Sequence, residues 1–65
     1  MFAHVIHQEV ETEVCCRKIT VMLHAVEVYD GAHWWQFSIS PRVTTPWRIA
    51  VTCAAAVRYV KEKMK

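Results

Sequence analysis

The sequence predicts an α+β fold of two layers, in which a three-stranded antiparallel β-meander packs against one C-terminal α-helix (βββα). The run Ile19–Tyr29 is β-branched and apolar, which is typical of a strand. Asp30-Gly31 separates it from a second β-rich run, and this dipeptide is typical of a hairpin turn. Thr45-Pro46 then precedes a segment with helical spacing. We expect one domain, residues 1–65, with strands at about 4–14, 19–29 and 32–40 and a helix at about 46–64.

The first strand is predicted from alternation between glutamates and neutral residues. Glu9, Glu11 and Glu13 fall on one side, and Val10, Thr12 and Val14 on the other, together with Phe2, His4 and Ile6. Cys15–Lys18 forms a turn or a bulge to the next strand. A loop of even length places Val10 on the face of Val21 and Leu23, whereas an odd loop or a bulge places it with Met22 and His24. The sequence leaves both arrangements open.

A two-residue turn at Asp30-Gly31 fixes the expected register of the second hairpin. One face then pairs Val28 with His33, Val26 with Trp35, His24 with Phe37 and Met22 with Ile39, and the other pairs Glu27 with Trp34, Ala25 with Gln36 and Leu23 with Ser38. In this register His24 lies in an apolar environment. We favour a core histidine with satisfied ring nitrogens over a packing switch that responds to pH.

The C-terminal segment has the signals of an amphipathic helix. Thr45 is the expected N-cap and Pro46 the first helical residue, while Pro41 ends the third strand. The expected apolar side consists of Ala50, Cys53, Val57, Val60 and Met64, with Trp47, Ile49 and Ala54 beside it. This helix covers the face that carries Trp35, Phe37 and Ile39.

One helix leaves the other sheet face uncovered, and that face is also apolar. We therefore expect a small non-enzymatic regulator or inhibitor that binds another protein and self-associates, as a homodimer, through this face. The expected partner-binding residues are Val21, Leu23, Tyr29 and Trp34. The glutamate row, Glu9 to Glu13, would remain as an acidic surface.

Charge is distributed unevenly along the chain and supports an alternative. The net charge is +2, but residues 1–40 carry about −3 and residues 41–65 about +5. The alternative is a nucleic-acid-binding protein that combines a basic surface with an exposed tryptophan for stacking. Its expected contacts are Arg17, Lys18, Arg42 and Arg48, with Trp34. A third interpretation is a designed scaffold without an evolved function.

Other functional classes lack a signature. Adjacent cysteines in an extended segment point to opposite faces, so Cys15 and Cys16 do not form a metal-ligand pair, and we expect no metal and no cofactor. The single glycine excludes phosphate-binding loops, and no thiol has a predicted base beside it, so we expect no catalytic residues. No apolar run has the length of a membrane span and the N-terminus lacks a signal-peptide pattern, so we expect a cytoplasmic protein with three free thiols.

Two short stretches resemble known families. The segment Asp30–Trp35 followed by a Thr-capped, alanine-rich helix is similar, in the order and spacing of its elements, to the small βββα domain of HicB-type antitoxins. The strands followed by Trp47–Ala55 resemble the C-terminal part of a double-stranded RNA-binding domain, but nearly all of the lysines of that family are replaced. These resemblances cover about half the chain, contain no functional residue and imply only the fold.

Overall fold

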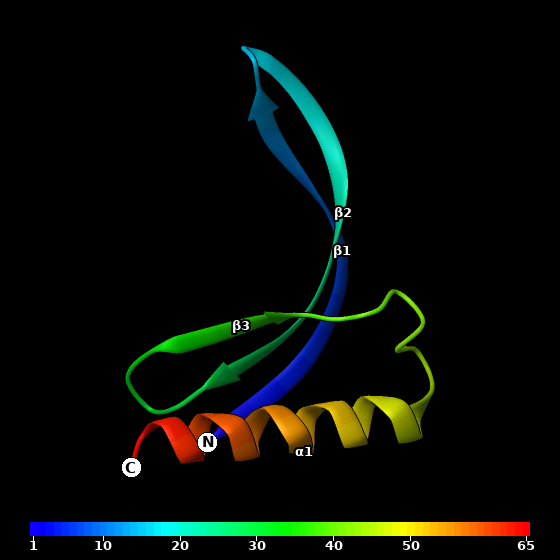
Figure 1. Ribbon diagram of the computed structural model, residues 1–65. Coiled ribbons are helices and arrows are strands. Elements are labelled where there is room, and N and C mark those ends of the chain that lie inside the picture. The colour runs from blue at the N-terminus through cyan, green and yellow to red at the C-terminus, as the bar shows by residue number, and fades with distance from the viewer.

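The computed structural model describes all of residues 1–65 and confirms the predicted α+β fold. Three antiparallel strands, in the order β1-β2-β3, are followed by one helix (Figure 1). The elements are β1 (Phe2–Val14), β2 (Arg17–Tyr29), β3 (Trp34–Ser38) and α1 (Pro46–Lys63). The helix lies across one end of the sheet rather than along its whole length (Figure 1).

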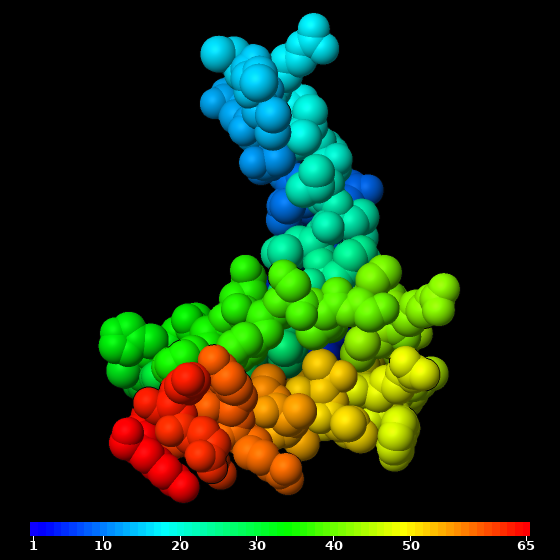
Figure 2. All heavy atoms as spheres, in the orientation of Figure 1, coloured from blue at the N-terminus to red at the C-terminus, as the bar shows by residue number.

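The long β1–β2 hairpin extends far beyond the rest of the molecule. β3 pairs only with Ala25–Tyr29 of β2, and α1 packs on the same end of the sheet. The outer part of the hairpin, residues 8–23, is therefore a two-stranded arm, and it projects from a compact base (Figures 1 and 2). The arm gives the protein its elongated outline of 41 × 28 × 14 Å.

The turn at the tip of the arm decides which faces β1 and β2 share. Val14 pairs with Arg17, so the loop consists of Cys15 and Cys16 alone, both with positive φ, 51° and 66°. Positive φ at both central residues is the requirement of the common two-residue hairpin turn. This even loop pairs Val10 with Val21, which is the first of the two predicted arrangements, and starts β2 two residues earlier than expected.

The second hairpin differs from the prediction by two residues in register. Its loop comprises Asp30–His33, with Tyr29 opposite Trp34, Val28 opposite Trp35 and Val26 opposite Phe37. The predicted pairs Val28–His33, Val26–Trp35, His24–Phe37, Met22–Ile39, Glu27–Trp34, Ala25–Gln36 and Leu23–Ser38 are wrong, and β3 begins at Trp34 rather than at residue 32. A shift of two positions preserves the alternation of side chains, so Trp35 and Phe37 still face α1 as predicted.

Asp30 explains the longer loop. Its Oδ1 accepts hydrogen bonds from the backbone N–H groups of Ala32 (2.8 Å) and His33 (2.7 Å), and its Oδ2 accepts one from Trp35 Nε1 (2.9 Å). A tight turn at Asp30-Gly31 would lose these bonds. Of the loop residues, only Gly31 has a positive φ, 106°. The predicted two-residue turn requires a positive φ at both of its central residues.

The loop is expected to weaken at acidic pH. The hydrogen bond from Trp35, followed by those from the backbone of His33 and Ala32, lowers the pKa of Asp30 from 3.8 to about 2. Because this folded-state pKa is depressed, the stabilisation is complete above about pH 4 and is lost as the pH falls through 2. The Trp35 indole N–H resonance should shift across this window. Asp30→Asn, which keeps Oδ1 as an acceptor, should remove the shift; an equal shift in that variant would exclude Asp30 as its cause.

The core lies between the base of the sheet and α1. Val26 and Val28 pack against Ala56 and Val60, and the surrounding partly buried side chains are Ala3, Val5, Trp35, Phe37, Ile39, Cys53 and Val57. The predicted coverage of the Trp35 face by the helix is confirmed. No helix of the protein combines the length and apolar character needed to cross a lipid bilayer.

The contact side of α1 is narrower than the predicted apolar side. Thr45 caps the helix as expected, since its side-chain oxygen accepts from Arg48 N at 3.3 Å. Ala56 is buried, whereas Trp47, Ala50, Ala54 and Met64 are exposed, contrary to the prediction. The helix covers only the base of the sheet, so apolar side chains away from that stripe have no surface to pack against.

Candidate functional site

The sheet has one face without any covering element, which we call the open face. It is the side opposite Val26 and Val28, whose side chains contact α1. Strand pairing places the following residues on it: Phe2, His4, Ile6, Gln8, Val10, Thr12 and Val14 of β1; Arg17, Ile19, Val21, Leu23, Ala25, Glu27 and Tyr29 of β2; Trp34, Gln36 and Ser38 of β3. The open face runs along the entire hairpin, from the base to the tip of the arm.

An aromatic cluster forms the base end of the open face. The Trp34 ring lies 5.1 Å from that of Tyr29, 5.6 Å from His4 and 6.4 Å from Phe2, between ring centroids. Trp34 and Phe2 nevertheless keep 55% and 56% of their surface exposed. Trp34 was expected beside Glu27, and its pairing with Tyr29 instead follows from the four-residue loop. The cluster is thus a surface of mutually packed rings in contact with solvent.

An aliphatic stripe continues the open face along the arm. Ile19, Val21 and Val14 are exposed, and Leu23 is half-buried beside them. The four predicted partner-binding residues, Val21, Leu23, Tyr29 and Trp34, therefore share one continuous face with this stripe. The prediction omitted the contribution of β1, namely Phe2, Ile6, Val10 and Val14, because it depends on the even tip loop.

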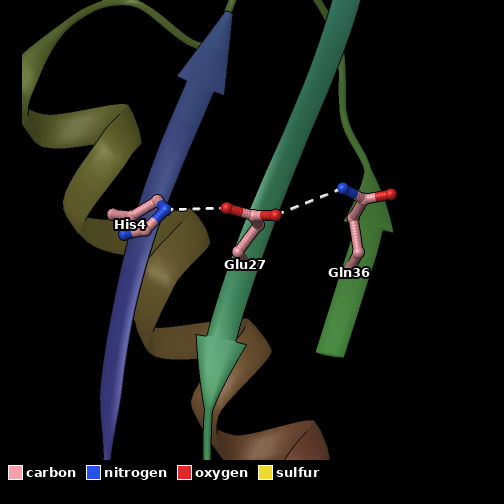
Figure 3. A network of polar contacts seen from close by, with 3 residues as sticks. All are labelled: His4, Glu27 and Gln36. Carbon is pink, nitrogen blue, oxygen red and sulfur yellow. Dashed lines mark hydrogen bonds and ion pairs between the residues drawn. The ribbon is translucent and has the colours of Figure 1, made fainter. Parts of the chain in front are cut away.

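A polar rung crosses the open face at the base (Figure 3). His4 Nε2 and Glu27 Oε1 are 2.8 Å apart, and Gln36 Nε2 donates to Glu27 Oε2 at 3.3 Å. The three residues lie on three adjacent strands, and Glu27 bonds to both neighbours. The only carboxylate on the open face is therefore held by partners within the same sheet.

The glutamate row lies on the opposite side of the arm. Glu9, Glu11 and Glu13 share the face of Met22, Thr20 and Lys18, their partners on β2. This is the face that α1 covers at the base, but the arm extends past the helix, so all three glutamates are exposed. The arm therefore has one acidic side and one apolar side.

The basic residues expected to contact nucleic acid lie in two separate places. Arg17 and Lys18 follow the turn at the tip of the arm, whereas Arg42 and Arg48 flank the start of α1 at the base (Figure 1). Arg17 and Lys18 themselves point to opposite faces of β2. The structure does not bring these four side chains together with Trp34 into one basic groove.

His24 pairs with another histidine rather than packing on Phe37. Its Nδ1 lies 2.7 Å from His7 Nδ1, and His7 Nε2 lies 2.7 Å from the carbonyl oxygen of Val43. Since a carbonyl only accepts, we assign the proton of His7 to Nε2, so His7 Nδ1 accepts from His24 Nδ1. The pair thereby joins the end of the arm nearest the base to Val43, in the segment before α1. Sequence spacing does not indicate this contact.

The remaining reactive groups do not assemble into a site. Cys15 and Cys16 are exposed free thiols at the tip, and partial burial against the core raises the pKa of the Cys53 thiol. No three potential ligands among histidine, cysteine, aspartate and glutamate lie close enough together to hold a metal ion. Two open depressions occur, both along α1, of about 430 Å³ beside Arg58 and Lys61 and about 200 Å³ beside Trp47 and Val51. The open face is the most extensive candidate surface.

Comparisons with protein-family models, with curated proteins and with solved structures find no match for this chain.

Proposed function

We propose that this protein is a non-enzymatic protein-binding module, a small regulator or inhibitor, that self-associates through the open face. The observation that carries the proposal is the uncovered apolar surface along a hairpin of two 13-residue strands. Soluble monomers seldom expose a continuous apolar surface of this extent, and such surfaces mark interaction sites.

The exposed surface area supports an interface of ordinary size. A compact monomer of 7.6 kDa exposes about 4,300 Å², whereas this chain exposes 5141 Å², an excess of about 850 Å². A stable protein interface buries about 800 Å² on each partner. Covering the open face once would therefore bring the exposed area close to that of a compact protein.

The composition of the open face suits burial. Its aromatic cluster and aliphatic stripe resemble the apolar, aromatic-rich centre of protein interfaces. Glu27 is bonded to His4 and Gln36, so covering the rung would not leave its carboxylate unpaired. Arg17, at the tip, is the one charged residue of the face without such a partner in the sheet.

Self-association would leave the glutamate row free. Glu9, Glu11 and Glu13 lie on the other side of the arm and would stay exposed in a dimer built on the open face. Three carboxylates about 7 Å apart along one strand form a surface complementary to a basic partner. We assign the regulatory or inhibitory contact with a second protein to this surface.

Sedimentation equilibrium of the unmodified chain tests the self-association. We expect a mass near 15 kDa, twice the 7.6 kDa of one chain, at micromolar concentrations. The mass should persist at high salt, because an apolar interface is insensitive to screening. A constant mass of one chain up to millimolar concentration would contradict the proposal.

A further inference from the structure

We propose that two copies pack open face to open face with their arms antiparallel, so that the tip of each arm lies over the aromatic cluster of the other copy. This inference rests on the proposed self-association and adds its geometry. It commits to a second copy of the same chain as the occupant of the open face.

The charges of the open face select the antiparallel direction. Arg17 stands at the tip end of β2 and Glu27 at the base end, ten positions away, and no other β2 residue of this face is charged. A parallel packing would bring the two Arg17 side chains to one level at the tips and the two Glu27 side chains to one level at the bases, so that like charges gather at each end. An antiparallel packing places each Arg17 opposite Glu27 of the second copy, which is the complementary arrangement.

The Arg17–Glu27 pairing also fixes the register. A two-fold axis midway between these residues passes between Val21 and Leu23, so Val21 faces Leu23 of the second copy. Ile19 falls at the level of Ala25, which is already buried within its own chain. Both copies use the same residues, as a symmetric dimer requires. Apolar residues of the stripe therefore meet apolar residues at the centre of the interface.

The same register explains the exposed aromatic cluster. Position 15, at the tip, falls opposite position 29, so the turn of one copy lies over Tyr29 and Trp34 of the other. On β1, Val14 falls opposite His4 of the second copy, next to Phe2. The apolar surface at the base is thereby covered by a segment that the monomer projects into solvent.

A distance between the two arm tips tests the arrangement. Cys16→Ser and Cys53→Ser leave Cys15 as the only site for a nitroxide spin label, and double electron–electron resonance then measures the label separation. The tips lie about 14 positions apart along the antiparallel strands, so we expect about 45 Å. A parallel packing would place the labels within about 20 Å, and that result would overturn the proposal.

The mass of the labelled protein separates the two hypotheses. A labelled chain that is dimeric but has a short tip distance overturns only the antiparallel arrangement. If the unmodified chain is itself monomeric, the proposed self-association fails and this inference fails with it.

A charge reversal gives a second test that needs no label. Arg17→Glu should raise the dimer dissociation constant about tenfold, because it places two carboxylates opposite each other in each half of the dimer. Lys18→Glu is the matched control: it makes the same change one residue away, on the face opposite the interface. Equal effects of the two substitutions would overturn the proposal.

Discussion

Replacement of Val60 by alanine is expected to lower the free energy of unfolding by about 2–3 kcal/mol. Val60 is fully buried, with 0% of its surface exposed, and contacts the strands through the core cluster. The substitution removes two methyl groups, worth about 1.6 kcal/mol of transfer free energy, and leaves a cavity. A core of this size rarely supplies more than about 3–5 kcal/mol in total, so the substitution should remove a large part of the stability.

Val51→Ala is the matched control for this experiment. Val51 belongs to the same helix, but 47% of its surface is exposed, so the same change should alter stability by less than about 0.5 kcal/mol. Urea denaturation followed by circular dichroism at 222 nm measures both variants at one protein concentration. Equal losses would mean that α1 does not pack on the sheet through Val60.

Leu23→Lys is expected to abolish self-association while leaving the fold intact. Leu23 is half-buried at the centre of the open face, so a lysine there can direct its ammonium to solvent in the monomer. In a dimer, the same ammonium would be enclosed by apolar side chains without a partner. We expect the dissociation constant to rise at least about a hundredfold, equivalent to about 2.7 kcal/mol.

Thr20→Lys controls for the added charge in the arm. Thr20 is exposed and lies on the opposite face of β2, paired with Glu11. Light scattering should report one chain for Leu23→Lys and a dimer for Thr20→Lys, with identical circular dichroism spectra. A dimeric Leu23→Lys variant would show that the open face is not the interface.

The sequence predicts which side chains of a strand share a face of the sheet, but it does not predict which residues pair across neighbouring strands. Alternation along β2 correctly separates Val26 and Val28 from Val21 and Leu23, because a pattern of period two assigns faces wherever the pairing begins. The register depends on the loop, and there the Asp30 side chain competes with the backbone preference of Asp30-Gly31. Hydrogen bonds from Ala32, His33 and Trp35 select the longer loop.

The shape of the candidate site was less accessible to sequence analysis. Nothing in the composition of Cys15-Cys16 favours positive φ, so the tight tip turn, and with it the contribution of β1 to the open face, was one of two alternatives. The separation of Arg17 from Arg48 arises because the hairpin extends past the helix. Amphipathic spacing also predicted more buried residues on α1 than the structure has. The spacing identifies the apolar side of a helix but not how much of the sheet that side covers.

The short pairing of β3 has a consequence for aggregation. Since β3 stops at Ala25 of β2, the arm has two free edges, β1 on one side and residues 17–23 of β2 on the other. Free edges can add strands from further molecules and so begin a fibril. Stacked copies of β1 would bring Glu9, Glu11 and Glu13 of successive molecules to about 4.8 Å from one another, and their carboxylates would repel. The arm is therefore protected against fibril growth by charge rather than by a covering strand.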